Sequence, residues 1–97
     1  MMYILAYDIS TESAKGKKRL RKVAKACENY GQRVQKSVFE FQLEDKKFLQ
    51  MKNKVLSLMN NKKDNVRIYK IIEPKENYVE EHGNFEAIDY ENDTLLI

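Results

Sequence analysis

The sequence predicts a small α+β fold in which two helices cover one face of a four-stranded sheet. Segments with the patterns of strands surround two segments with helical spacing, in the order strand, helix, strand, strand, helix, strand. The chain has 97 residues, of which 42% are hydrophobic and 34% are charged. Because separate cores form only at roughly 250 residues, we expect one domain over residues 1–97.

The first strand and the first helix are predicted from the N-terminal third. Residues 1–7 are apolar at almost every position, which is typical of an interior strand covered on both faces, and Asp8 ends it. Residues 9–12 include capping-type side chains, so a helix should follow as far as about Tyr30. Gly31 is expected to end this helix in the left-handed conformation of a C-terminal cap. One helical face carries the apolar residues Leu20, Val23, Ala24, Cys27 and Tyr30.

Residues 32–43 alternate as a strand does, but the apolar phase slips by one residue. Val34 and Val38 are in one phase, and three later apolar residues are in the other. Those three are Phe39, Phe41 and Leu43. Because side chains alternate with a period of two, the slip requires a bulge or a tight bend. We therefore expect two short strands joined near Ser37.

A second amphipathic helix is expected over residues 44–61, followed by a strand that Pro74 ends. The helix face carries Phe48, Met51, Val55, Leu58 and Met59. The strand carries Val66, Ile68, Ile71 and Ile72. The order βαββαβ predicts a ferredoxin-like layer with both helices on one face of an antiparallel sheet.

Charge divides the chain into a basic body and an acidic tail. Residues 1–73 carry 17 Lys and Arg against 8 Asp and Glu, whereas residues 74–97 carry one Lys against seven acidic residues. The body suggests binding to a polyanion, and the tail could shield that surface or dock on a basic partner, although solubility alone is the alternative. Within residues 75–97, the terminal segment TLLI regains strand character. We expect this acidic extension to supply an extra C-terminal strand that crosses to a second copy in a homodimer.

No apolar stretch approaches the roughly 20 residues of a membrane helix, so we expect no membrane association and no export. The single cysteine, Cys27, fits a reducing compartment, which makes the cytoplasm the expected location. Because Cys27 lies on the apolar helix face, we expect it in the core and not as a nucleophile. The lone His82 lacks the partners of a zinc site and should lie on the surface.

Asp8 is the residue that the pattern singles out for chemistry, because it ends an apolar strand where the chain reaches solvent. Carboxylate oxygens suit hard cations such as Mg²⁺, which binds through one or two carboxylates and keeps several waters. Two Asp8 side chains that meet across a dimer axis could hold one ion between them. The alternative is that Asp8 only caps the turn that follows.

The run from Lys15 to Lys25 holds seven basic residues and no acid. Like charges one helical turn apart repel each other, which favours an anionic partner such as a phosphate backbone. A solvated helix face is the alternative. The candidate nucleic-acid-binding residues are Lys15, Lys17, Lys18, Arg19, Arg21, Lys22, Lys25 and Arg33.

Three segments resemble the family of CRISPR-associated protein two. They are YDIS at residues 7–10, KRLRKV at residues 18–23 and YGQRVQKSVFEF at residues 30–41. The chain length, the spacing of these segments and the terminal TLLI extend the resemblance over almost the whole chain. One departure is that Lys15, Lys17 and Lys18 stand where the family often has more arginine.

The resemblance implies a ferredoxin-like homodimer that works in CRISPR adaptation. There it joins a larger integrase, which captures foreign DNA and inserts it as spacers. It also implies a metal-dependent endonuclease that cuts single-stranded RNA or double-stranded DNA, with Asp8 binding Mg²⁺, or Mn²⁺ in its place. The implied residues around the site are Tyr7, Asp8, Arg19, Arg21, Arg33, Ser37 and Phe39.

Three functions stay open from the sequence. The first is the nuclease, and the second is a non-catalytic nucleic-acid-binding scaffold that bridges integrase dimers. The third is a regulatory or RNA-binding module of the same fold with unrelated biology.

Overall fold

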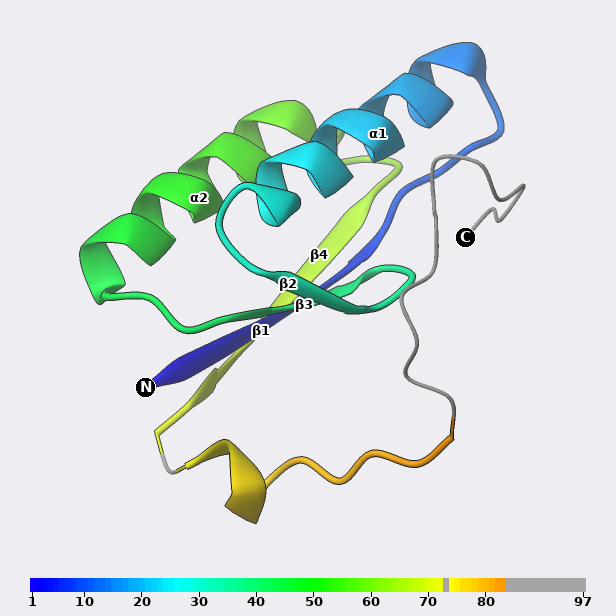
Figure 1. Cartoon of the computed structure of the whole chain (residues 1–97). Coiled ribbons are helices and arrows are strands. Elements are labelled where there is room, and N and C mark those ends of the chain that lie inside the picture. Colours follow the sequence, from blue (N-terminus) through cyan, green and yellow to red (C-terminus); the bar gives the residue numbers. More distant parts are fainter. Residues whose placement is uncertain (73, 84–97) are drawn as a thin grey trace.

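Two helices pack on one face of a four-stranded antiparallel sheet (Figure 1). The computed structural model describes residues 1–72 and 74–83. The elements are β1 (Met2–Asp8), α1 (Ala14–Glu28), β2 (Gln32–Gln35), β3 (Val38–Phe41), α2 (Asp45–Leu58), β4 (Asn65–Ile71) and the short 3-10 helix η1 (Lys75–Asn77). The sheet order is β2-β3-β1-β4, which confirms the predicted α+β fold with the order βαββαβ.

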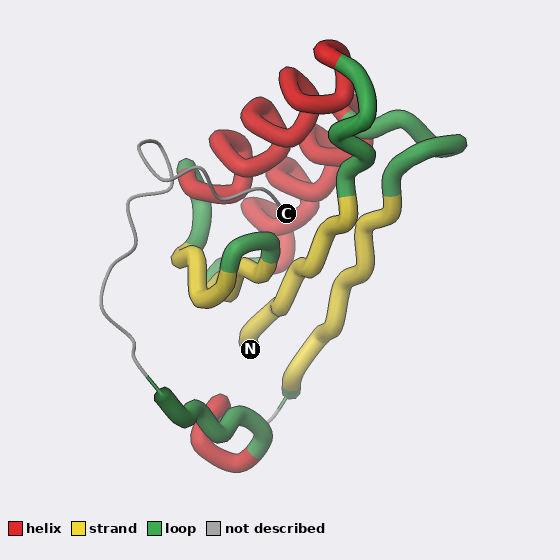
Figure 2. Tube along the Cα trace, turned by 90° about the vertical axis from the view of Figure 1, so that its right-hand side faces the viewer, coloured by secondary structure: helices red, strands yellow, loops and turns green. Residues whose placement is uncertain are grey.

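The helices lie on one side of the sheet, and η1 lies apart from them (Figure 2). The predicted C-terminal strand falls on residues 84–97, which are outside the described residues. The extent of the domain over residues 1–97 therefore stays a prediction. Within the described part of the chain, no helix is both long enough and apolar enough to cross a membrane.

Strand β1 is the interior strand of the sheet, as predicted. It pairs with β3 through residues 3–6 and with β4 through residues 2–8. Its alternate residues Tyr3, Leu5 and Tyr7 are buried in the core under the helices. In the opposite phase, Ile4 and Ala6 are only half-buried, so the helix-free face of the sheet is incompletely covered. The expectation of full coverage on both faces holds only for the helix side.

The core between the layers confirms the predicted apolar faces of both helices. It includes Val23 and Cys27 from α1, and Phe48, Met51 and Val55 from α2. The expected contribution of Tyr30 is wrong, because α1 ends at Glu28 and Tyr30 is exposed beyond it. Helix α2 is also shorter than predicted: it ends at Leu58, so Met59 follows the helix in an extended conformation.

Aromatic contacts join α2 to the sheet. The rings of Tyr3 and Phe48 stack with their centroids 3.7 Å apart, and Phe41 meets Phe48 edge-on. The Tyr3 hydroxyl donates a hydrogen bond to Asp45 at the start of α2. This fixes the first turn of α2 over the beginning of β1.

The phase slip in residues 32–43 has the predicted structural cause. Strands β2 and β3 are separated by a two-residue turn at Lys36 and Ser37. The register also shifts between Arg33 and Gln35, so a bulge accompanies the turn. The turn and the bulge together place the side chain of Phe39 in the core.

Gly31 does not adopt the predicted left-handed conformation. The only described residue with a positive φ is Gly83, and the cap of α1 is Asn29 in the right-handed region. Instead, a Cβ at Gly31 would come within 2.5 Å of the Glu40 carbonyl oxygen and would collide with the Phe41 ring. A glycine is needed there because the chain leaving α1 passes closely over β3.

Replacement of this glycine should therefore destabilise the fold. We expect Gly31→Ala to lower the free energy of unfolding by about 1–3 kcal/mol, the usual cost of overpacking, in a urea titration. The neighbouring Gln32→Ala, at an exposed position, is the control and should change it by less than about 0.5 kcal/mol. Equal stability of Gly31→Ala and wild type would contradict the close-approach explanation.

Candidate functional site

Asp8 lies at the end of the central strand, and its side chain is exposed. It pairs with Asn65 and shares the phase of Ile4 and Ala6, so it faces away from the helices. In residues 1–72 and 74–83, no three His, Cys, Asp or Glu side chains come together as metal ligands would. Among the described residues, Asp8 is therefore not part of a larger cluster of metal-ligating side chains.

A buried carboxylate, Asp64, holds the segment that follows Asp8. Its Oδ1 accepts hydrogen bonds from the Ser10 backbone N–H at 3.0 Å and from Arg19 Nη2 at 3.1 Å. Its Oδ2 accepts from Arg19 Nε at 2.8 Å and from the Asn60 backbone N–H at 2.7 Å. The side chain of Asp64 is fully buried, and that of Arg19 is 18% exposed. The loop after β1, helix α1 and the turn before β4 thus meet at one side chain.

Asp64 is ionised at neutral pH. Burial alone would raise its pKa, but the hydrogen bonds from Arg19, Asn60 and Ser10 outweigh burial and hold the pKa below its usual value. The hydrogen bond to Asp64 in turn raises the pKa of Arg19. Arg19 is thus engaged inside the fold, and the expectation that it contacts phosphate stays a prediction.

Four of the candidate residues form a separate cluster where β1 meets β2, β3 and the turn between them. The Tyr7 backbone N–H donates to the Ser37 carbonyl at 3.0 Å, and the rings of Tyr7 and Phe39 are 6.1 Å apart. The Arg33 guanidinium lies 5.1 Å from the centre of the Phe39 ring and forms an ion pair with Glu28 at 3.2 Å. Burial raises the pKa of Tyr7 to about 12, although Arg33 opposes the shift, so Tyr7 is neutral.

The side chains of Tyr7, Arg33 and Phe39 lie on the opposite face of the sheet from Asp8. Phe39 is fully buried and Tyr7 is buried on the helix side, where packing accounts for both side chains. Arg21 is exposed on α1 and belongs to neither group. Catalytic roles for Tyr7, Arg33, Ser37 and Phe39 stay predictions, and burial favours packing for Tyr7 and Phe39.

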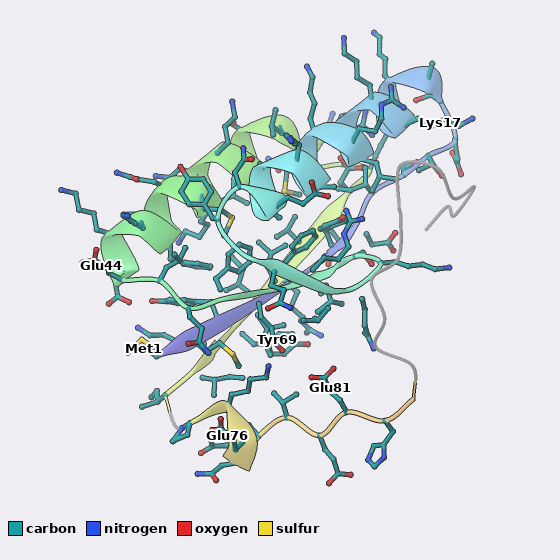
Figure 3. The ribbon with its side chains drawn as sticks, viewed as in Figure 1. Met1, Lys17, Glu44, Tyr69, Glu76 and Glu81 are labelled. Atoms are coloured by element: carbon teal, nitrogen blue, oxygen red, sulfur yellow. The ribbon has the colours of Figure 1, made fainter. Side chains whose placement is uncertain are left out.

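The outer surface of the helical layer is basic, and basic side chains project from both helices in Figure 3. The exposed candidates on α1 are Lys15, Lys17, Lys18, Arg21, Lys22 and Lys25. Helix α1 begins at the end of the sheet where β1 ends, and its cap is Ser13, whose hydroxyl accepts from the Gly16 N–H at 3.0 Å. Sequence reasoning missed three exposed lysines of α2, although they lie outside its apolar face. They are Lys46, Lys47 and Lys54.

Two further residues were missed. Arg67 pairs opposite Ala6, so it lies on the helix-free face, where its guanidinium is 5.8 Å from the centre of the Tyr69 ring. The alternation of apolar and polar residues along β4 could have identified Arg67 as a residue of the open face. Asp64 had a weaker signal, as an acid at the end of a polar turn directly before a strand.

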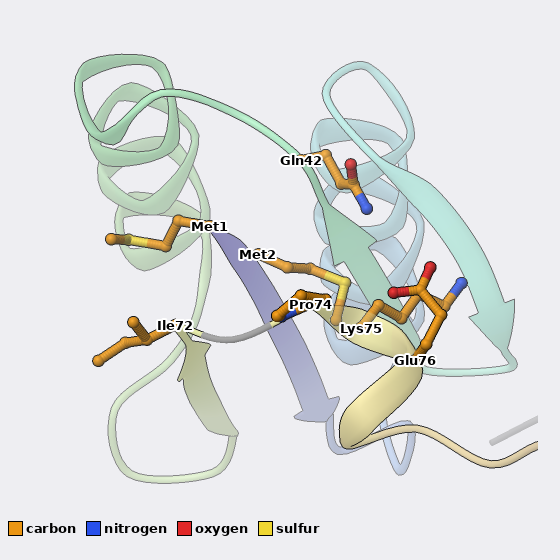
Figure 4. Close-up of a pocket in the computed structure, with 7 residues that line it drawn as sticks. All are labelled: Met1, Met2, Gln42, Ile72, Pro74, Lys75 and Glu76. Atoms are coloured by element: carbon orange, nitrogen blue, oxygen red, sulfur yellow. The ribbon is translucent and has the colours of Figure 1, made fainter.

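A hollow of about 340 Å³ lies at the other end of β1 (Figure 4). It is lined by Met1, Met2, Gln42, Ile72, Pro74, Lys75 and Glu76. Because it is at the N-terminal end of β1 and Asp8 is at the C-terminal end, the hollow is not part of the Asp8 site.

Cys27 is buried in the core, as predicted, and His82 is exposed beside Glu80. Burial raises the pKa of the Cys27 thiol to about 12, with a smaller opposing effect from Arg33. The thiol is therefore protonated at neutral pH and is unsuited to nucleophilic chemistry.

Comparisons with known proteins point to one family. The model of the family described as CRISPR associated protein Cas2 matches residues 1–79. The chain is 48% identical over 96 residues to the CRISPR-associated endoribonuclease Cas2 1 of Moorella thermoacetica, covering 98% of this chain and 100% of that protein. It is 45% identical over 96 residues to the CRISPR-associated endonuclease Cas2 of Halalkalibacterium halodurans, covering 99% of this chain and 100% of that protein.

Two solved structures have a similar fold. A crystal structure of Streptococcus pyogenes Cas2 at pH 6.5 matches with a TM-score of 0.76 and 41% identity, covering 86% of this chain and 100% of that chain. A hypothetical protein from Thermus thermophilus matches with a TM-score of 0.71 and 30% identity, covering 89% of this chain and 94% of that chain.

The buried thiol predicts a loss of stability at alkaline pH. Because the pKa of Cys27 is higher in the folded than in the unfolded chain, its contribution is complete below about pH 9 and is lost as the pH rises towards 12. Between pH 7 and pH 10, the free energy of unfolding in urea should fall by about 1.4 kcal/mol more in wild type than in Cys27→Ala. Equal falls in the two proteins would show that the thiol is not responsible.

Proposed function

This chain belongs to the CRISPR associated protein Cas2 family, and we propose from that membership that it is a CRISPR-associated endonuclease whose chemistry depends on Asp8. The observation that carries the proposal is the exposed carboxylate of Asp8 at the end of the central strand, on the face that the helices leave open. The names of the relatives, endoribonuclease and endonuclease, support hydrolysis of phosphodiester bonds.

The carboxylate of Asp8 suits a divalent cation, either Mg²⁺ or Mn²⁺. Mg²⁺ prefers oxygen ligands and is usually bound through one or two carboxylates while it keeps several waters, so a sparse donor set fits this ion. When bound, the ion would supply charge neutralisation and a water of lowered pKa. The contribution of the chain itself is to present the carboxylate at a fixed place on the sheet.

A second copy of the chain would complete this donor set. The helix-free face of the sheet carries half-buried Ile4 and Ala6 and the 48%-exposed Tyr69. Two such faces packed against each other would remove apolar surface from water. In a symmetric dimer the same patch meets itself, so the two Asp8 side chains would lie at the same interface. The acidic extension at residues 75–97 is part of this proposal, as the segment whose terminal strand crosses to the partner.

The basic surface of α1 accounts for binding of nucleic acid. Lys15 and Lys17 lie in the first turn of α1, at the end of the sheet where Asp8 lies, and Lys17 is labelled there in Figure 3. Lys22 and Lys25 continue the exposed surface along the helix. Phosphate contacts of this kind hold a strand without reading its bases, so single-stranded RNA and double-stranded DNA are both candidate substrates.

A second candidate function is a scaffold that holds DNA for a larger integrase during spacer insertion. The observation that favours it is the separation of the basic helical surface from Asp8, which lie on opposite sides of the sheet. Binding through that surface needs no carboxylate at Asp8. In this scaffold the acidic extension would dock on the integrase, and cleavage would be an additional activity.

The nuclease proposal predicts that cleavage requires Asp8. With Mg²⁺, wild type should cut end-labelled single-stranded RNA or duplex DNA, whereas Asp8→Asn should be at least 100-fold slower, because it lacks the anionic oxygen ligand. Glu12→Gln is the matched control, since Glu12 is an exposed acid in the same loop, and it should cut at the wild-type rate. Cleavage by Asp8→Asn at the wild-type rate would rule out the proposed site.

Binding, by contrast, should depend on α1. We expect Lys22→Glu/Lys25→Glu to weaken duplex binding at least tenfold and to lower the slope of log K against log salt by about two, one for each lost phosphate contact. The control Lys62→Glu/Lys63→Glu reverses two exposed charges in the turn before β4 and should bind like wild type. An equal loss of duplex affinity in the two double variants would mean that net charge, and not the α1 surface, governs binding.

A further inference from the structure

The placement of Asp8 depends on residues beyond the strand. Asp8 is the last residue of β1, and its pairing partner Asn65 is the first residue of β4. Of the two strands beside β1, only β4 therefore pairs with Asp8. Whether its carboxylate has a fixed position depends on how the next residues are held.

The next two residues are held firmly. The side chain of Ile9 is buried in the core. The backbone N–H of Ser10 donates to Asp64, as described above. The Ser10 carbonyl lies against Gly16 of α1, so closely that a Cβ on Gly16 would come within 3.0 Å of the carbonyl carbon and would overlap the oxygen. Ser10 is thus held on both its N–H and its C=O side.

Asp64 is itself fixed, because each of its two carboxylate oxygens accepts two hydrogen bonds. The two bonds from Arg19 form a bidentate pair, which constrains orientation as well as distance. A buried ion pair adds little net stability compared with apolar packing, since both charges lose their hydration. What the four hydrogen bonds do is to fix the orientation of Asp64, and through Ser10 they hold the main chain two residues after Asp8.

We propose that Asp64 is a positioning residue for Asp8, with Arg19 acting through Asp64. Asp64 anchors Ser10, and the anchored segment presents the Asp8 carboxylate in one orientation before metal or nucleic acid binds. Such preorganisation lowers the barrier of a reaction without any contact to substrate. The expected effect on cleavage rests on the proposed function of Asp8. The anchoring of Ser10 by Asp64 can be tested without it.

The variant Asp64→Asn tests the anchor. It keeps the size of the side chain but replaces one acceptor oxygen with an N–H₂ group, which cannot accept from the donors that surround it. Glu40→Gln is the matched control, because Glu40 is also largely buried and forms an ion pair with Lys75 at 3.0 Å, but it lies opposite Ile4, towards the other end of β1 from Asp8. If Asp64→Asn does not fold, Arg19→Gln replaces it, since it removes the bidentate pair and leaves the carboxylate.

The first measurement needs neither metal nor substrate. The ¹⁵N heteronuclear NOE of residues 8–10 should fall clearly below that of wild type in Asp64→Asn and stay unchanged in Glu40→Gln. The variants are compared at a temperature where circular dichroism shows all three proteins folded. Unchanged NOE values in Asp64→Asn would overturn the anchor.

The second measurement is steady-state cleavage with Mg²⁺. Asp64→Asn should lower kcat at least tenfold and leave KM within twofold, because the lysines that bind the strand are untouched, whereas Glu40→Gln should change neither by more than twofold. A wild-type kcat in Asp64→Asn, or an equal fall in Glu40→Gln, would overturn the positioning role. If wild type itself does not cleave, the proposed function fails, and the NOE measurement alone decides whether Asp64 anchors the loop.

Discussion

The carboxylate of Asp64 joins three segments that are far apart in the sequence. It binds the loop after β1 through Ser10, helix α1 through Arg19 and the turn before β4 through Asn60. Because β1 is the central strand and β4 pairs along its whole length, this junction sets how the helical layer meets one end of the sheet. The tight contact of Gly16 with Ser10 belongs to the same junction. Asp8 leaves the sheet there and is placed by it.

The same arrangement separates two surfaces. Exposed lysines occupy the outside of the helical layer, and Asp8 and Arg67 occupy the face that the helices leave open. A protein that only held nucleic acid would need the first surface, and one that also cut it would need the second. The two surfaces share no described side chain, so a substitution can change one of them and leave the other intact. In the proposed dimer, the apolar residues of the open face, including Tyr69, would pack against the second copy of the chain.

The sequence was sufficient for features that depend on local periodicity. The helices, the interior strand and the break near Ser37 follow from spacings of 3.6 and two residues, and the structure confirms them. Asp8 was identified for the same reason, because the end of an apolar run is visible locally.

Contacts between distant residues were not predictable in this way. Arg19 and Asp64 are 45 residues apart, and an arginine within a basic run gives no sign that it faces inward. Gly31 was misread because glycine serves both left-handed caps and close approaches, and only the position of β3 distinguishes the two uses. The grouping of Tyr7 with Arg33 and Phe39, on the face opposite to Asp8, likewise required the sheet.

Amide hydrogen exchange in the wild-type protein tests most directly whether Asp64 holds this junction. The Ser10 and Asn60 N–H groups both donate to Asp64, whereas Glu12, two residues after Ser10, is exposed in the same loop. We expect the amide protons of Ser10 and Asn60 to exchange at least 100-fold more slowly than that of Glu12, as amides hydrogen-bonded to a buried group do. Exchange of Ser10 as fast as Glu12 would mean that the loop beyond Asp8 is not anchored, and would contradict the account.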